Sequence, residues 1–294
     1  MSLLGGGSSA TWVWRGQDWR EVDKSGPPGG AGGHVFFDNH AQRLRYVSRK
    51  FEEWEWHGHE WTSLRIMGRP QVEPTLFGPK FALDPRSGSV VAIVSDPVAG
   101  VPAATWLLSG DTWRKAERAP VDDGVLVASG EEDRLLLFGS AGGTPPPAPH
   151  VWQWTADRWV QLPAEPGGVR LLGGGPVSGA YDPVGRRYVV QAGDDVQEFR
   201  DGRWSSLLGA GSPCTGSGDD CAGVVYSPQA GAVLAFQPGE WWELSGRSWI
   251  KRPTSVGPRV TFAHLAYDPS TQNVVLFGGC DHGGLDTQVC QGPG

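Results

Sequence analysis

A nine-residue segment that ends in tryptophan recurs six times along the chain and constrains the fold more than any other feature of the sequence. Its first copy, TWVWRGQDW, spans 11–19, and every copy carries a large apolar residue five positions before the closing Trp. The copies begin at Thr11, Glu53, Thr105, Val151, Val196 and Trp241. Alternating residues, a short turn and a second aromatic strand are typical of a tight β-hairpin. Successive closing Trp residues lie 42 to 52 residues apart, and a period of this size predicts a propeller or a solenoid.

A second hairpin motif alternates with the first and also occurs six times. Its copies begin at His34, Lys80, Gly124, Ser178, Gly223 and His264. Each is an apolar strand, a turn that usually carries Asp-Pro or Ser-Pro, and a second strand rich in Val, Leu and Phe. Pro after Asp presets such a turn. The two hairpins give four strands per repeat of about 46 residues, which is the content of one propeller blade.

The chain begins with an outer hairpin and ends with an inner one. The copy at 11–22 lacks an inner hairpin, and the copy at 264–279 lacks an outer hairpin. Pairing the two closes a ring and leaves no sheet edge unpaired. We therefore predict an all-β, six-bladed β-propeller of four-stranded antiparallel blades. We assign 1–294 to a single domain, with repeats over 11–279 and a C-terminal tail over 280–294.

Short motifs within the repeats carry a resemblance to a known family. The motifs are Phe277-Gly278-Gly279, Phe138-Gly139, the Tyr-Asp-Pro turns at 181–183 and 267–269, and Pro258-Arg259 ahead of His264. In these features the chain resembles the bacterial kelch-like, galactose-oxidase-type β-propellers over nearly its whole length. The resemblance implies the architecture, and it implies no activity because one fold serves many functions.

Charge and hydropathy exclude several classes of partner. The net charge is −7 with no basic run, so we expect no nucleic-acid partner. No stretch approaches the roughly 20 apolar residues that cross a bilayer, and we expect no membrane span. The first ten residues lack the basic start and apolar segment of a signal peptide. We expect a monomer.

Four cysteines fall into two close pairs, Cys214 with Cys221 and Cys280 with Cys290. An even number at short spacing favours two local disulfides and an oxidising compartment. We therefore expect a secreted or periplasmic protein whose signal peptide is not part of this sequence, and a tail pinned by the second bond. Reduced thiols and a metal site are the alternatives, although the pairs lack the CxxC spacing of zinc ligands.

The candidate binding surface is the face that carries the loops between hairpins, since those loops vary in length and function concentrates on variable loops of a rigid scaffold. The six residues that open the inner hairpins should surround the loop-side mouth of the central channel. His264, His34 and Lys80 would come from three neighbouring blades as a cationic arc, able to hold a carboxylate or a sugar acid. Alternatively, these residues satisfy loop carbonyls and line a water-filled channel. The candidate ligand-binding residues are His34, Lys80, Ser178, Arg259, His264 and His282.

No catalytic residue, metal site or cofactor is predicted. His57-Gly58-His59-Glu60 lies in a tight turn that would spread its side chains apart, so we interpret it as structural or exposed histidine. No GxSxG, phosphate loop or HExxH motif occurs. We predict a non-catalytic binding or scaffold propeller that recognises a protein, peptide or small ligand on its loop face. The alternative is a carbohydrate-active protein, either a lectin or a divergent glycosidase, because Trp-rich sites suit sugar faces.

Overall fold

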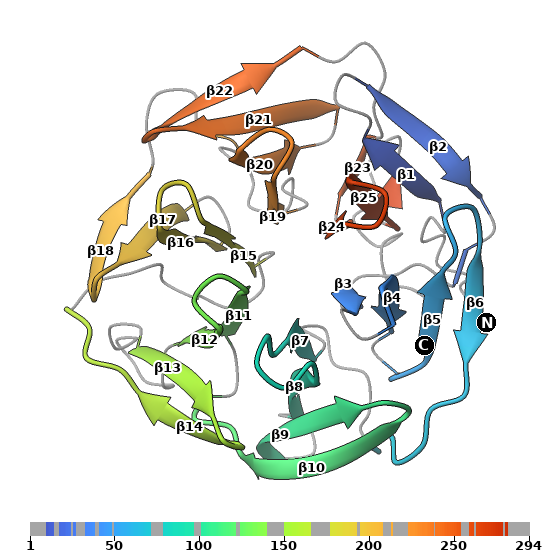
Figure 1. Ribbon diagram of the computed structural model, residues 1–294, viewed down its shortest axis with the longest axis vertical. Coiled ribbons are helices and arrows are strands. Elements are labelled where there is room, and N and C mark those ends of the chain that lie inside the picture. The colour runs from blue at the N-terminus through green and yellow to red at the C-terminus, as the bar shows by residue number, and fades with distance from the viewer. Residues whose placement is uncertain are drawn as a thin grey trace, which may run out of the picture.

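The computed structural model describes the greater part of the chain, and all of its regular elements are β-strands (Figure 1). The described residues are 10–14, 18–24, 26–27, 33–38, 41–48, 50–71, 79–96, 101–121, 124–139, 150–165, 177–192, 195–207, 213, 223–237, 239–253, 259–261, 263–278 and 280–281. The strands form six four-stranded antiparallel sheets arranged in a ring. The predicted six-bladed β-propeller is confirmed. Within these residues, no helix has the length and apolar character needed to cross a membrane.

Five blades are continuous in sequence, and we number them along the chain with strands ordered from the centre outward. Blade 1 contains β3 (His34–Asp38), β4 (Arg43–Val47), β5 (Glu53–Trp56) and β6 (Trp61–Leu64). Blade 2 contains β7 (Lys80–Leu83), β8 (Val90–Asp96), β9 (Val101–Ser109) and β10 (Thr112–Arg118). Blade 3 contains β11 (Gly124–Ser129), β12 (Arg134–Gly139), β13 (His150–Thr155) and β14 (Arg158–Gln161). Blade 4 contains β15 (Val177–Asp182), β16 (Arg187–Ala192), β17 (Asp195–Arg200) and β18 (Arg203–Ser206). Blade 5 contains β19 (Gly223–Ser227), β20 (Ala232–Gln237), β21 (Glu240–Ser245) and β22 (Ser248–Arg252).

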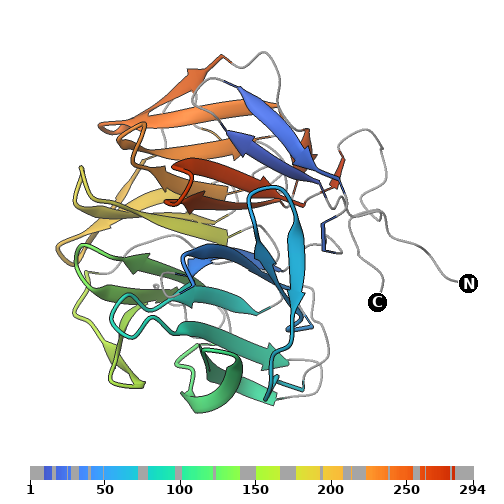
Figure 2. The same cartoon turned by 45° about the vertical axis from the view of Figure 1, so that its right-hand side comes forward.

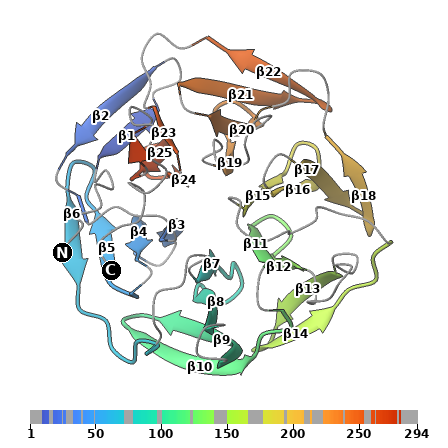
Figure 3. The ribbon, with the colours of Figure 1, turned by 180° about the vertical axis from the view of Figure 1, so that it is seen from behind.

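Blade 6 joins the two ends of the chain, as the sequence predicts. From the centre outward it contains β24 (His264–Asp268), β25 (Asn273–Phe277), β1 (Thr11–Trp14) and β2 (Trp19–Asp23). The closing pair is β1 with β25, which are antiparallel from Thr11 opposite Phe277 to Trp14 opposite Val274. Figure 3 shows the six innermost strands, β3, β7, β11, β15, β19 and β24, around the centre of the closed ring.

A small ribbon lies outside the blades. It pairs β23 (Val260–Thr261) with β26 (Cys280–Asp281), just before β24 begins and just after β25 ends. The ribbon therefore belongs to the loop side of blade 6, next to the end of that sheet (Figure 2). Cys214, Cys221 and Cys290 lie outside the described residues, and only the backbone place of Cys280 is described. The two disulfides stay predictions.

The turn inside each inner hairpin is held by a residue at the end of the innermost strand, or directly after it in blade 2. That residue is Asp or Ser in every blade and is buried in every blade: Asp38, Asp84, Ser129, Asp182, Ser227 and Asp268. In each turn its side-chain oxygen accepts a hydrogen bond from a backbone N–H two or three residues later, at 2.9 to 3.4 Å. Asp and Ser favour turns through these contacts. The repeated Asp-Pro and Ser-Pro motifs therefore act as turn caps on one face of the ring.

The apolar core lies between neighbouring blades. Between blades 1 and 2, for example, Phe51 meets Trp113 edge-on with ring centroids 5.4 Å apart, and Phe81 lies 5.6 Å from Phe51. Similar clusters of Trp, Phe, Val and Leu join the other adjacent pairs. Aromatic pairs of this kind stabilise a core beyond the area they bury. The Trp residues of the repeat thus pack between adjacent blades around the ring.

The closing Trp of each nine-residue segment is directed at the first residue of the segment in the preceding blade. Where that residue carries an oxygen, the indole nitrogen donates a hydrogen bond to it. The three bonded pairs are Trp61 to Thr11 at 2.9 Å, Trp113 to Glu53 at 2.7 Å and Trp159 to Thr105 at 2.9 Å. All three acceptors are fully buried.

The other three interfaces carry an apolar residue at the same position, namely Val151, Val196 or Trp241. The indole N–H groups of the corresponding Trp204, Trp249 and Trp19 are buried without a hydrogen-bond partner among the described residues. At this repeat position, three successive blade interfaces therefore have a hydrogen bond, and the other three have apolar packing. A single repeat position makes this difference.

Candidate functional site

The residues predicted to surround the channel mouth lie at the starts of the innermost strands. His34, Lys80, Gly223 and His264 are the first residues of β3, β7, β19 and β24, and Ser178 is the second residue of β15. Blade 3 differs by one position. Its Ser129 pairs with Arg134 as Asp38 pairs with Arg43 in blade 1. Counting back from Ser129 makes the buried Val125, and not Gly124, the counterpart of His34.

His34 is half-buried at the start of β3. Its ring stacks on Phe81 of blade 2, with centroids 6.1 Å apart and planes inclined by 29°. Burial, together with the charges of His264 and Lys80, lowers the pKa of His34 to about 3. Desolvation and like charges both disfavour the imidazolium form. His34 is therefore a neutral imidazole at physiological pH. Anion binding at the mouth stays a prediction.

These residues come from three neighbouring blades. His264 of blade 6, His34 of blade 1 and Lys80 of blade 2 begin the neighbouring innermost strands β24, β3 and β7. The three residues thus follow one another around the centre of the ring, and their role in ligand binding stays a prediction. The three residues are therefore a neutral imidazole, His34, between Lys80 and a second histidine, His264.

Aromatic packing fixes the position of this cluster. The ring of Tyr46 lies 6.1 Å from that of His264 and 4.7 Å from that of Phe277, and Tyr46 is buried. Directly before His34, a Cβ on Gly33 would lie 2.4 Å from the Tyr46 hydroxyl oxygen, so only glycine fits there. Tyr46 and Phe81 were not predicted as parts of the site. In the sequence they read as strand residues of the core, and only the register shows which ends of their rings face the mouth.

The Ser178 hydroxyl forms two hydrogen bonds within the protein. Its hydroxyl donates to Gln191 Oε1 at 2.9 Å and accepts the backbone N–H of Val224 at 2.9 Å. These two bonds tie β15 to β16 and blade 4 to blade 5. The hydroxyl proton is used within the protein, and we leave Ser178 out of the proposed ligand-binding set.

The remaining predicted ligand-binding residues divide between exposed and undescribed positions. Arg259 is exposed just before β23, and a Cβ on Gly239 of blade 5 would lie 3.6 Å from its side chain. His282 lies outside the described residues. None of the described residues that open the innermost strands is a carboxylate, whereas a glycosidase uses a pair of them about 5 to 9.5 Å apart.

The histidines at 57 and 59 lie on the turn face, in the hairpin between β5 and β6. His57 contacts Arg43 and lies 3.4 Å from Glu55, while His59 is 75% exposed and lies 3.6 Å from Glu60. The two side chains therefore have different partners, which agrees with structural or exposed roles. No group of three or more metal-ligating side chains occurs within the described part of the chain.

No family model and no curated protein matches the sequence. The fold resembles that of several solved structures. A structural-genomics protein of unknown function from Bacteroides thetaiotaomicron is 11% identical with a TM-score of 0.55, and the match covers 92% of this chain and 76% of that one. The structure of YjhT is 10% identical with a TM-score of 0.55, covering 84% and 92%. A protein assigned as a TolB from Agrobacterium tumefaciens is 13% identical with a TM-score of 0.56, covering 94% and 99%.

At these identities the similarity concerns the fold alone. It extends along nearly the whole chain, so the propeller architecture is common to all three proteins and to this one. The kelch-like assignment made from sequence motifs has no matching family model and stays a prediction. One fold hosts many functions, and the function has to be argued from the residues of this chain.

Proposed function

We propose that this protein is a non-catalytic binding propeller that holds an anionic group of its ligand at the loop-side channel mouth. The proposal rests on one observation: His264, His34 and Lys80 are the first residues of β24, β3 and β7, which are neighbouring innermost strands. A carboxylate placed there would accept charge-assisted hydrogen bonds from the Lys80 ammonium. It would also counter the positive charges that disfavour protonation of His34.

The anion could belong to an acidic side chain or C-terminus of a peptide, or to a sugar acid. Both present a carboxylate, and the rest of the ligand would be read by the loops of this face. We further propose that the protein is kelch-like and extracytoplasmic, on the motifs and the paired cysteines of the sequence.

A binding screen tests the mouth. Acidic peptides and sugar acids would be titrated by calorimetry into the wild type and into Lys80→Ala and His264→Ala. Lys115→Ala and His59→Ala are matched controls, because both residues are exposed and lie on outer strands or turns. We expect binding that weakens about tenfold or more in each mouth variant and is unchanged in the controls. Binding that is equal in all five proteins would remove the mouth as the site.

A further inference from the structure

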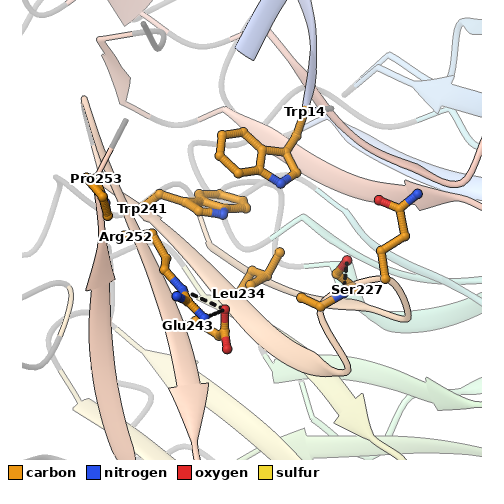
Figure 4. Close-up of a pocket in the computed structure, with 9 residues that line it drawn as sticks. Trp14, Ser227, Leu234, Trp241, Glu243, Arg252 and Pro253 are labelled. Atoms are coloured by element: carbon orange, nitrogen blue, oxygen red, sulfur yellow. Dashed lines mark hydrogen bonds and ion pairs between the residues drawn. The ribbon is translucent and has the colours of Figure 1, made fainter. Parts of the chain in front are cut away.

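A cavity lies between blades 5 and 6. Its volume is about 570 Å³, within the range of roughly 300 to 1,000 Å³ that is typical of small-molecule sites. Ser227, Gln229 and Ala230 at its edge belong to the β19–β20 turn. Trp241, Arg252 and Pro253, at the other end of the outer strands, complete the lining with Trp14 of blade 6. We call it the blade 5–6 pocket, and Figure 4 shows its side chains.

One wall of the pocket is made of indole rings and follows from a change in the repeat. At this interface the first position of the nine-residue segment is Trp241, where other blades carry Thr, Glu or Val. Trp241 lies 5.6 Å from Trp14 and 5.2 Å from Trp19, ring to ring. All three rings are buried, so the wall is rigid. Trp14 and Trp241 turn the nitrogen edges of their rings toward the side of the pocket where Leu234 and Ser227 lie (Figure 4).

Beside Trp241, which pairs with Arg252 in the sheet, the lining carries a charged pair with no net charge. Arg252 Nε lies 2.8 Å and Arg252 Nη2 lies 2.5 Å from the same oxygen, Oε2 of Glu243. Oε1 of Glu243 takes part in neither contact. The pocket thus offers a carboxylate oxygen as acceptor and guanidinium N–H groups as donors, with no net charge between them. Gln229 adds an exposed amide, which both donates and accepts.

We propose that the blade 5–6 pocket binds a neutral saccharide unit. Each sugar hydroxyl both donates and accepts a hydrogen bond, which matches a lining that mixes indole and guanidinium donors with carboxylate and amide acceptors. The C–H faces of a sugar match the apolar surface of Leu234, Ala230 and the indoles. A charged ligand would gain nothing from the balanced Glu243–Arg252 pair, in contrast to the channel mouth.

The pocket does not depend on the proposed anion site, and the two can be tested separately. The protein would be labelled with 5-fluorotryptophan and titrated with glucose, galactose, mannose and N-acetylglucosamine, with ¹⁹F resonances assigned through Trp14→Phe and Trp241→Phe. The binding variants are Glu243→Gln, which keeps the shape of the side chain, and Arg252→Ala at a half-exposed position. Lys251→Ala is the matched control, because Lys251 neighbours Arg252 on β22 but contacts Glu240.

We expect saturable shifts of the Trp14 and Trp241 resonances with at least one neutral sugar. The dissociation constant should rise about tenfold in Glu243→Gln and in Arg252→Ala, and should stay unchanged in Lys251→Ala and Lys80→Ala. The proposal is overturned if none of the sugars shifts these resonances saturably. It is equally overturned if the binding survives both pocket variants, or if Lys80→Ala abolishes it, because the sugar would then bind elsewhere.

Discussion

Replacing Glu53 by Gln should stabilise the protein in a pH-dependent way. Glu53 is the first residue of β5, has no exposed surface, and accepts the indole N–H of Trp113 through Oε1 at 2.7 Å. Its Oε2 is buried without a hydrogen-bond partner among the described residues. Burial raises the pKa of Glu53 to about 7, against the combined effect of the Trp113 bond and the charges of Arg45 and Arg69. The blade 1–2 interface thus favours a protonated carboxyl.

The raised pKa of Glu53 sets the sign and the size of this pH-dependent stability difference. In the unfolded chain Glu53 titrates near 4.5. Between that value and about 7 the folded protein holds a proton that the unfolded chain has released, so stability present below pH 4.5 is lost as the pH rises through 7. A rise from 4.5 to about 7, at about 1.4 kcal/mol per pKa unit, corresponds to about 3 kcal/mol. Gln keeps an acceptor for Trp113 and never ionises. Glu53→Gln should therefore be about 3 kcal/mol more stable than wild type at pH 8, relative to their difference at pH 4.

Urea unfolding of both proteins from pH 4 to pH 8 measures this difference. The measured quantity is the difference in unfolding free energy between Glu53→Gln and wild type. The opposite pH dependence from His34 is present in both proteins and cancels in this difference. Glu60→Gln is the control, since Glu60 is 65% exposed, and its difference from wild type should hardly change with pH. A Glu53→Gln difference that is constant from pH 4 to pH 8 would refute the reasoning.

Three further predictions concern other parts of the fold. Thr105→Val should lower the free energy of unfolding in urea by about 1 to 3 kcal/mol, because it leaves the buried indole N–H of Trp159 without an acceptor. Val151→Thr should not lower it. A larger loss in Val151→Thr than in Thr105→Val would contradict the role assigned to this repeat position. Because burial depresses the pKa of His34 to about 3, its contribution to stability is complete above pH 6.5 and is lost as the pH falls toward 3. His34→Phe should flatten that acid limb of the unfolding free energy, and an unchanged limb would be inconsistent with a buried neutral imidazole. Non-reducing peptide mapping should find the four cysteines in two local disulfides, and four free thiols would disprove them.

Most of the architecture could be predicted from the sequence because each blade repeats the same physical solution. The Trp hairpin and the Asp-Pro turn recur at a fixed period, and the half-repeats at the two ends leave ring closure as the arrangement without unpaired edges. The register of blade 3 was the exception. Its turn has Ser129-Gly130, with neither the Asp nor the Pro that marks this turn in the other blades, so the sequence does not show Ser129 as the equivalent of Asp38.

The candidate site was harder to predict, for reasons that depend on environment. The sequence places His34 beside Lys80 and His264, but its charge is decided by burial against Phe81, which no local pattern reveals. Ser178 looks available in the sequence, and only the fold shows its hydroxyl bonded across to blade 5. The sequence does contain a signal for the acceptors Thr11, Glu53 and Thr105. They occupy the first position of the nine-residue segment, which is apolar in the other three copies.

The central claim is that an anion binds between Lys80 and His264 at the loop-side mouth, and histidine NMR tests it most directly. The chain has seven histidines, so their ¹⁵N side-chain signals can be followed individually during titration with an acidic peptide or glucuronate. The account predicts saturable shifts of the His34 and His264 signals that disappear in Lys80→Ala, while those of His57 and His59 on the turn face stay fixed. Histidine signals at 34 and 264 that do not move with either anion would contradict it.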